Sequence, residues 1–176
     1  RAWLPNFVVV DDGSSDNTAE KASWAGAHVV RHAINLGQGA ALGTGIRYAL
    51  LQQAHCVITF DADGQHQPDD IDVLLKVARE QGADVVLGSR FLGQASDMPL
   101  SRRWLLKLAT AYTRCTTGLD VSDAHNGLRL FTRKAAEQLH IRQNRMAHAS
   151  EMLGWLGSSR LRIVEAPVNI IYTNYS

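Results

Sequence analysis

Hydrophobic residues along this chain form short runs that alternate with longer stretches in which apolar positions recur every three or four residues. The short runs predict strands at 7–10, 27–31, 57–60, 84–88, 128–131 and about 163–172. The periodic stretches predict helices over 19–25, from about 42 to 50, after Pro68, over about 101–116 and before Glu151. The helix after Pro68 is expected to carry Ile71, Leu74, Leu75 and Ala78 on one apolar face. This alternation of strands and helices predicts an α/β fold.

Composition favours a single domain over residues 1–176, because 176 residues with 45% hydrophobic content can bury a sizeable core. No apolar run is long enough to cross a bilayer, and no secretory leader is visible. Cys56 and Cys115 are too few and too far apart for a disulfide framework or a zinc site, so both are expected to be small buried residues of a reducing compartment. Since the chain opens at Arg1 without a methionine, we expect a piece of a longer protein.

The net charge of +1 hides an asymmetry between the two halves of the chain. Residues 1–88 carry 6 basic and 11 acidic side chains, whereas residues 89–176 carry 12 basic and 6 acidic ones. An acidic half suits a cation, and a basic half suits a phosphate or a membrane surface. The alternative is that the split reflects solvated helix surfaces only.

The most informative stretch follows the predicted strand at 57–60, where Asp61, Asp63 and Gln65 stand close together. We expect this strand to be buried, central and parallel, which places the three side chains at its carboxyl tip, where open α/β sheets bind ligands. Two carboxylates and an amide oxygen suit Mg²⁺ or Mn²⁺ and leave positions for phosphate oxygens. The alternative for an Asp-x-Asp alone is a solvated turn that caps the next helix.

A second acidic tip follows the strand at 7–10, where Asp11 and Asp12 precede the turn residue Gly13. Helix capping does not account for two acids at a strand tip, and their carboxylates suit hydrogen bonds to a base or a ribose. The small residues of 35–45 allow the next helix to begin close to another backbone or to a ligand. Their spacing misses the dinucleotide-binding fingerprint by one residue, so close helix packing is the alternative for most of these glycines.

Basic candidates lie in the second half. Arg90 follows the fourth predicted strand and is expected to be a salt-bridge partner or a phosphate clamp. The helix at 101–116 carries Arg103, Lys107 and Arg114 on one face, which suits anionic lipid headgroups, an ordinary solvated face being the alternative. Its apolar face is formed by Trp104, Leu108, Ala111, Tyr112 and Cys115.

Together these motifs resemble the nucleotide-sugar-dependent glycosyltransferases of family 2, in particular the dolichyl- and polyprenyl-phosphate sugar transferases. The resemblance follows the family's order over nearly the whole chain. The matching stretches are Val-Asp-Asp-Gly-Ser-Ser-Asp-Asn-Thr at 10–18, Asn-Leu-Gly-Gln-Gly-Ala-Ala at 35–41, Asp-Ala-Asp-Gly-Gln-His-Gln-Pro at 61–68, Gly-Ser-Arg at 88–90, Asp-Ala-His-Asn-Gly-Leu-Arg at 123–129 and Glu-Ala-Pro-Val at 165–168. It implies a GT-A-type, Rossmann-like sheet, mixed and mostly parallel and flanked by helices, with the family's first strand missing ahead of Arg1.

The resemblance also implies roles for individual residues. The donor-side residues are Asp11, Asp12, Asp61 and Gly37 for the nucleotide, and Asp61, Asp63 and Gln65 for a divalent metal, Mg²⁺ or Mn²⁺. Arg90 and Arg129 match basic residues that grip the acceptor phosphate. Asp123 lies near the position of the general base in the wider family.

The implied reaction is an inverting displacement that moves one sugar from a nucleotide-diphosphate sugar to a polyprenyl phosphate or a glycan. A sugar hydroxyl needs a base, whereas a phosphate monoester with a second pKa of about 6 is already largely anionic. The Gln-x-x-Arg-Trp motif of processive synthases is absent, which favours transfer of a single sugar. No nucleic-acid partner is expected, and the expected location is cytoplasmic, with peripheral contact at the cytoplasmic face of a membrane.

Three other classes share part of this pattern. Phosphatases of the haloacid dehalogenase type also carry Asp-x-Asp at a strand tip, but they usually have Thr or Val where this chain has Gln65. Nucleotidyltransferases normally open with a Gly-rich, basic loop at their first strand, a region that precedes Arg1 here. A nucleotide-sugar-binding module without turnover is the non-enzymatic alternative, and the acids and arginines named above speak against it.

Overall fold

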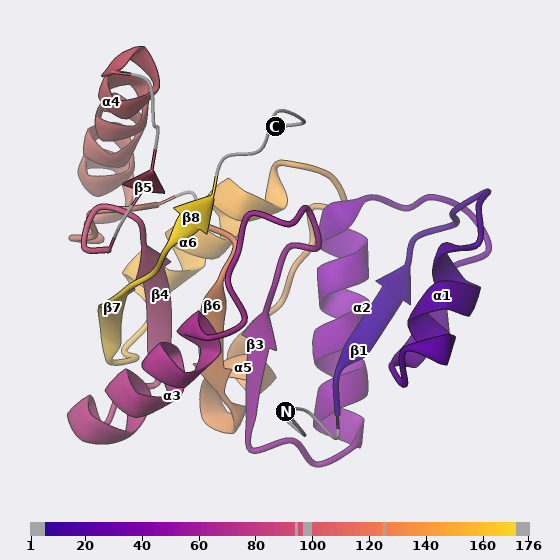
Figure 1. Ribbon diagram of the computed structural model, residues 1–176. Coiled ribbons are helices and arrows are strands. Elements are labelled where there is room, and N and C mark those ends of the chain that lie inside the picture. The colour runs from indigo at the N-terminus through magenta and orange to yellow at the C-terminus, as the bar shows by residue number, and fades with distance from the viewer. Residues whose placement is uncertain (1–5, 94, 97–99, 125, 172–176) are drawn as a thin grey trace. The chain divides into compact units, whose positions relative to one another are not determined.

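The computed structural model describes residues 6–93, 95–96, 100–124 and 126–171 (Figure 1). The chain folds into two compact units. The first unit comprises residues 1–54 and 139–152, and the second comprises residues 55–138 and 153–176. The predicted α/β class is confirmed, since both units combine helices with strands that pair in parallel.

The first unit is built on a strand–helix–strand motif. Strands β1 (Val8–Asp11) and β2 (His28–Arg31) pair in parallel and are joined by helix α1 (Thr18–Trp24). Helix α2 (Gln38–Leu51) follows β2 and packs against β1, where Val10 lies close to Gly45. Strand β1 ends at Asp11, and Asp12 begins the loop that follows it.

The second unit is built on a four-stranded sheet in the order β3-β6-β4-β7. Strand β6 runs antiparallel to β3 and β4, and β4 runs parallel to β7. A smaller parallel pair is formed by β5 and β8. The strands are β3 (Cys56–Thr59), β4 (Val85–Ser89), β5 (Ala95–Ser96), β6 (Arg129–Thr132), β7 (Ile163–Pro167) and β8 (Ile170–Ile171).

Four helices accompany these strands: α3 (Asp70–Gln81), α4 (Leu100–Thr117), α5 (Arg133–Gln138) and α6 (His148–Ser158), the last of which crosses the boundary between the two units. Helix α3 packs along the sheet and ends at Gly82, whose left-handed backbone (φ 57°) suits a glycine. Helix α4 projects away from the sheet in Figure 1. No helix among the described residues is long and apolar enough to span a bilayer.

The core of the second unit lies between α3 and the strands β4, β6 and β7. The predicted apolar face of α3 points toward this core, and Ile71 and Leu74 on that face are buried. The most buried members of this core are Leu74, Ala83, Val86, Leu128, Leu130, Ala166 and Val168. A well-packed core of this kind holds the strand tips in fixed register, and the candidate site is built on those tips.

Four expectations need correction. Strand β3 is neither central nor paired in parallel: it stands at one end of the described four-stranded sheet and bonds to the antiparallel β6. Strands β1 and β3 are half-buried, because each is bonded along one edge only in the described structure, whereas β4 is buried throughout. The strand predicted at about 163–172 is divided into β7 and β8. Neither cysteine is fully buried: Cys115 on α4 is exposed, and Cys56 on β3 is half-buried.

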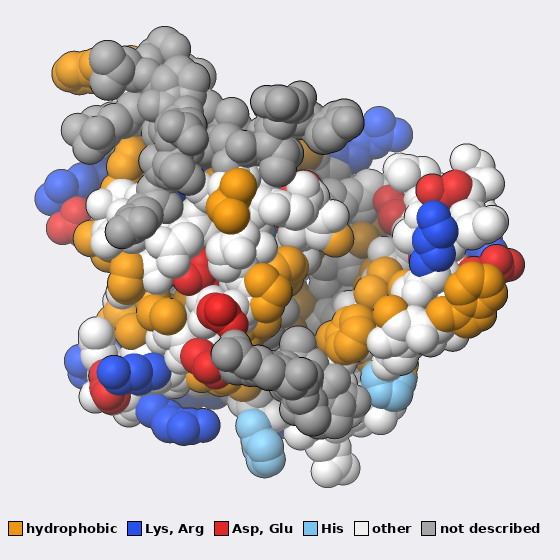
Figure 2. Space-filling view, viewed as in Figure 1, with side chains coloured by type: hydrophobic (Ala, Val, Ile, Leu, Met, Phe, Trp, Pro, Cys, Tyr) orange, Lys and Arg blue, Asp and Glu red, His pale blue; other side chains and the backbone are white. Residues whose placement is uncertain are grey.

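Charged side chains of both signs occur on the described surface in view. Figure 2 shows Lys, Arg, Asp and Glu side chains interspersed over the described part of one face, without a broad patch of a single sign. This view agrees with exposed ion pairs such as Lys134–Asp84 and Arg114–Asp120. The charge asymmetry along the chain is therefore weak evidence for a partner on this face.

Candidate active site

In the first unit, Asp11 is held at the tip of β1. One of its oxygens accepts a hydrogen bond from the Ser14 amide at 3.0 Å, and the other lies 3.1 Å from Nε of Arg31, which also bonds the Ser14 carbonyl. Hydrogen bonds from Ser14, helped by the charge of Arg31, lower the pKa of Asp11 against the effect of burial. Asp11 therefore carries a stable negative charge that shapes the turn after β1.

Asp12 fastens the start of the Gly-rich stretch to the same strand tip. Its carboxylate accepts hydrogen bonds from the amides of Leu36 (2.9 Å) and Gly37 (2.7 Å) and lies 2.7 Å from Nδ1 of His32. The other ring nitrogen of His32 is hydrogen-bonded to Thr44 on α2. Desolvation opposes the ionisation of Asp12, but these hydrogen bonds outweigh it, so its pKa is lowered. The predicted nucleotide-binding residues Asp11, Asp12 and Gly37 are thus brought together.

Gly37 cannot be replaced without rearrangement. Its backbone has a φ of 103°, and a side chain would collide with the Asn144 carbonyl and with Arg145. Close by, a cleft of about 350 Å³ is lined by Gly13, Ser14, Arg31, His32 and Ala33. Arg31 and His32 were not predicted as site residues, although both stand at the tip of the strand at 27–31, where the same rule applied to Asp11 and Asp12 would have found them.

In the second unit, Asp61, Asp63 and Gln65 occupy the turn that follows β3. Asp63 is exposed and accepts a hydrogen bond from the Gln65 amide at 3.0 Å, and the Gln65 carbonyl accepts one from Ile171 on β8. No group of three His, Cys, Asp or Glu side chains that would suit a metal occurs in the described part of the chain. Two carboxylates and one amide oxygen fit part of the shell of Mg²⁺ or Mn²⁺, and other oxygens must complete it.

Arg129 is the buried positive charge of this region. Its guanidinium donates from Nε to the Asn126 carbonyl at 2.8 Å and from an NH₂ group to the Ala124 carbonyl at 3.4 Å. Burial lowers the pKa of Arg129, and the charges of Asp61 and Asp123 oppose that effect. Arg129 therefore stands as a counter-charge to two of the predicted site carboxylates.

Arg90 and Asp123 form a close, buried pair. Oδ2 of Asp123 accepts hydrogen bonds from Nε of Arg90 at 2.6 Å and from its backbone amide at 3.1 Å. The side chains are 9% and 1% exposed, respectively. Both bonds to one residue fix the direction of the Arg90 guanidinium beyond the tip of β4.

Gly127 lets the Asp61 carboxylate lie against the loop before β6. A Cβ atom at this position would overlap that carboxylate. The same loop is tied to the end of β3, because the Thr59 hydroxyl donates a hydrogen bond to the Gly127 carbonyl at 2.7 Å. Asp61, Arg90, Asp123 and Arg129 are thus gathered in the second unit, with Asp63 and Gln65 on the adjoining turn.

Two further polar residues of this region, His66 and Asn126, were not predicted as site residues. Among the described residues, Nδ1 of His66 and Nδ2 of Asn126 are buried without a hydrogen-bond partner, which is uncommon in folded proteins. His66 lies 3.8 Å from Asp61, and Asn126 lies within the loop that contacts Arg129. Both stand inside stretches singled out for their acids and arginine, but their polarity alone gave no sign of burial.

Comparison with known proteins gives the family. The sequence profile of glycosyl transferase family 2 matches residues 5–140. A UDP-N-acetylglucosamine–dolichyl-phosphate N-acetylglucosaminyltransferase of Methanococcus voltae is 33% identical over 97% of this chain and 76% of that protein. A polyprenol monophosphomannose synthase of Mycolicibacterium smegmatis is 33% identical over 77% of this chain and 54% of that protein.

Solved structures agree on the fold. Glucosyl-3-phosphoglycerate synthase of Mycobacterium tuberculosis, crystallised with Mn²⁺ and UDP-glucose, matches with a TM-score of 0.63 and 20% identity, over 95% of this chain and 60% of that one. The chain spans about three fifths of the length of that structure. These findings confirm the GT-A fold, and the chain belongs to glycosyl transferase family 2, in the branch of the dolichyl- and polyprenyl-phosphate sugar transferases.

Proposed function

We propose that this protein is a metal-dependent, inverting glycosyltransferase that moves one sugar from a nucleotide-diphosphate sugar to a polyprenyl phosphate. One observation carries the choice of acceptor: the Asp123 side chain is buried and accepts two hydrogen bonds from Arg90. A general base must reach the proton that it removes. A carboxylate committed in this way is better suited to orient Arg90, and a phosphate acceptor needs an oriented arginine rather than a base.

Residues for donor binding are proposed in each unit by itself. Asp61, Asp63 and Gln65 would hold Mg²⁺ or Mn²⁺, and a bound metal ion would neutralise charge on the diphosphate leaving group. Asp11 and Asp12 shape the loops for the base and ribose, and the cleft beside Ser14 and Arg31 lies in the same unit. The mycobacterial synthase crystallised with Mn²⁺ and UDP-glucose supports a divalent metal and a nucleotide sugar.

On the acceptor side, we propose that Arg90 contacts the phosphate and that the buried Arg129, whose charge acts on Asp61 and Asp123, adds positive charge to the site. Arg129 is buried and donates hydrogen bonds to the backbone carbonyls of Asn126 and Ala124. The orientation of Arg90 is instead set by a side chain, that of Asp123, in the loop between α4 and β6. The dolichyl-phosphate and polyprenol relatives support a lipid phosphate as the acceptor. With an anionic nucleophile, the reaction is a direct displacement at the anomeric carbon, with the nucleoside diphosphate leaving.

The test is a transfer assay with the protein and a panel of radiolabelled UDP-, GDP- and CMP-sugars. Label should enter polyprenyl phosphate with one donor, in the presence of Mn²⁺ or Mg²⁺, and EDTA should stop the transfer. Hydrolysis of a generic phosphate ester without sugar transfer would instead place the protein with the phosphatases. Metal-dependent binding of a nucleotide sugar without transfer to any acceptor would identify the protein as a nucleotide-sugar-binding module without turnover.

We further propose that the protein contacts the cytoplasmic face of a membrane through α4. Trp104 and Leu108 are 67% and 66% exposed, and Ala111 and Cys115 continue the same exposed apolar stripe. The helix contains Arg102, Arg103, Lys107 and Arg114 and no acidic residue, a composition that suits an anionic lipid surface.

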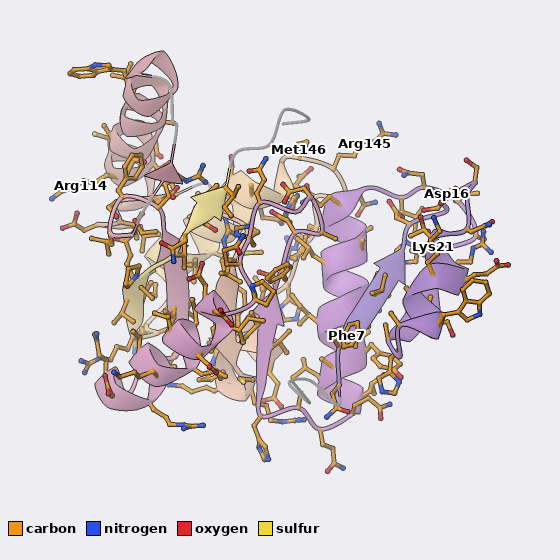
Figure 3. The ribbon with its side chains drawn as sticks, viewed as in Figure 1. Phe7, Asp16, Lys21, Arg114, Arg145 and Met146 are labelled. Atoms are coloured by element: carbon orange, nitrogen blue, oxygen red, sulfur yellow. The ribbon has the colours of Figure 1, made fainter. Side chains whose placement is uncertain are left out.

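The lipid contact differs from the sequence-based interpretation in one respect. That interpretation relied on the basic face formed by Arg103, Lys107 and Arg114. Arg114 lies in the last turn of α4 (Figure 3) and pairs with Asp120 at 3.2 Å. The side chains of Arg103 and Lys107, like that of Tyr112, lie outside the described residues. The exposed apolar stripe is therefore the part of α4 that carries the proposal.

Changing Trp104 and Leu108 together to serine should lower vesicle binding at least about tenfold. The variant no longer gains the free energy of moving these two apolar side chains from water into the lipid surface. Trp24→Ser is the matched control, since Trp24 is 83% exposed on α1 and belongs to the first unit. Co-sedimentation with phosphatidylcholine–phosphatidylglycerol vesicles measures the effect, and binding should weaken with salt. Equal sedimentation of the double variant and the parent would contradict the proposal, as would a salt-independent dimer that covers the stripe.

A further inference from the structure

Glu165 lies on β7 and accepts three hydrogen bonds from a loop that is distant in sequence. Its two carboxylate oxygens receive the Ser122 amide at 2.8 Å, the Ser122 hydroxyl at 2.9 Å and the Asp123 amide at 3.1 Å. Two successive backbone N–H groups directed at one anion form a strong local site for negative charge. The Glu165 carboxylate thus fixes the backbone from which the Asp123 side chain extends.

A second chain of hydrogen bonds links this loop to β4. The hydroxyl oxygens of Ser122 and Ser89 are 2.6 Å apart, and because Ser122 donates to Glu165, Ser89 donates to Ser122. The Ser89 oxygen in turn accepts the Phe91 amide at 3.2 Å. The residues on both sides of Arg90 are therefore connected, through two serine hydroxyls, to the carboxylate on β7.

These two sets of bonds meet at the Arg90–Asp123 pair. Strands β4 and β7 are paired in register, with Leu87 opposite Glu165, so the carboxylate and the tip of β4 are held on one rigid support. Ser89 is fully buried, and Asp123, taken as a whole residue, is 3% exposed. A rigid set of buried hydrogen bonds behind a charged pair is the arrangement that keeps a binding group oriented.

We propose that Glu165 is a positioning residue for acceptor binding: it holds the Ser122–Asp123 backbone so that Asp123 aims the Arg90 guanidinium at the acceptor phosphate. This inference rests on the proposed function for the identity of the acceptor, and on the hydrogen bonds alone for the positioning. Glu165 acts through Asp123, so its loss should affect the acceptor and leave the donor nucleotide undisturbed.

Asp84 provides a matched control within the same sheet. It stands at the opposite end of β4, where its carboxylate accepts the Arg162 amide at 3.0 Å and the Lys134 ammonium at 3.0 Å. Like Glu165, it is an acid that ties a backbone amide to this sheet, but it lies away from the Arg90–Asp123 pair. A general loss of sheet stability would be common to both variants, whereas a loss of positioning would be specific to Glu165.

The experiment compares Glu165→Gln with Asp84→Asn. Glutamine keeps the shape of the side chain but its amide nitrogen cannot accept the Ser122 amide, so kcat/KM for the lipid phosphate should fall about tenfold. The affinity for the donor nucleotide with Mn²⁺ should change by less than about twofold. In the Asp123→Ala background, where no side-chain oxygen is left to orient Arg90, Glu165→Gln should add little, because residues that act through one another are not additive. Asp84→Asn should leave both the donor affinity and the kcat/KM for the acceptor unchanged.

Amide hydrogen exchange over residues 119–124 gives a readout that does not depend on turnover. Exchange should quicken in Glu165→Gln and remain as in the parent in Asp84→Asn. If the parent transfers no sugar to a lipid phosphate, the proposed function fails, while the exchange result still decides whether Glu165 holds the loop. Equal losses for donor and acceptor, additive effects with Asp123→Ala, or unchanged exchange would overturn the inference.

Discussion

Replacing Asp63 with alanine is expected to abolish metal-dependent binding of the nucleotide and to lower the transfer rate at least about a hundredfold, because a bound metal ion supplies several kcal/mol of charge stabilisation. Asp63 is exposed and accepts a hydrogen bond from the neighbouring Gln65 amide. The fold should therefore survive, since no core contact is removed. Too few protein oxygens gather at this turn to bind a metal tightly without the diphosphate.

The measurement is calorimetric titration of UDP and GDP in Mn²⁺ and in EDTA. Asp72→Ala is the control, because Asp72 is an exposed acid on α3 in the same stretch of sequence and should leave binding unchanged. The parent should bind nucleotide far more tightly with Mn²⁺ than with EDTA, and Asp63→Ala should lose that difference. Equal affinity of the parent for the nucleotide in Mn²⁺ and in EDTA would show that nucleotide binding does not depend on a metal ion.

Gly127→Ala should be nearly as damaging as the loss of an acid. The added Cβ atom would overlap the Asp61 carboxylate, so either that carboxylate or the loop before β6 must move. The loop is bonded to Thr59 and contacts Arg129 through its neighbour Asn126, which makes the carboxylate the easier group to displace. A displacement of about 1 Å in a reacting site costs on the order of a hundredfold in rate.

Gly154→Ala is the matched substitution. Gly154 lies inside α6 with open space where its Cβ would stand, so alanine should be neutral or stabilise the protein by up to about 1 kcal/mol. Transfer rates and thermal unfolding of both variants separate loss of the site from loss of the fold. Full activity of Gly127→Ala would show that the position of Asp61 against this loop does not matter.

The sequence predicted the local parts of the fold better than their assembly. The apolar spacing at Ile71 and Leu74 identified the buried face of α3, because a face of that period is fixed by the chain itself. The place of β3 in the sheet was missed, since pairing depends on which distant strand supplies hydrogen bonds, and β6 lies some seventy residues further along. The exposure of Cys115 was missed because it also depends on distant contacts. A periodic apolar face shows that a helix is amphipathic, but it does not show whether another part of the chain covers that face.

The candidate site shows the same difference between contacts that are local in sequence and contacts that are distant. Asp61, Asp63 and Gln65 were predicted, because three residues within one turn need no tertiary information to be neighbours. The bond between Arg90 and Asp123 spans 33 positions, and the bonds of Glu165 to Ser122 span 43. Contacts of this range follow from the register of β4 with β7, which the pattern of hydrophobic residues leaves open.

The central claim is that the acceptor is a phosphate which needs an oriented arginine and no base. The most direct test compares Arg90→Ala with Asp123→Asn in the transfer of labelled sugar to polyprenyl phosphate, with thermal unfolding measured alongside. Loss of a charge-assisted contact to phosphate costs about 1.5–3 kcal/mol, so Arg90→Ala should slow transfer about ten- to a hundredfold. Asp123→Asn should slow it less, because asparagine keeps an oxygen that accepts from Arg90. A folded Asp123→Asn protein that loses about 10²–10⁴-fold in rate, beside an Arg90→Ala protein that keeps most of its activity, would contradict the claim and identify Asp123 as a general base for a hydroxyl acceptor.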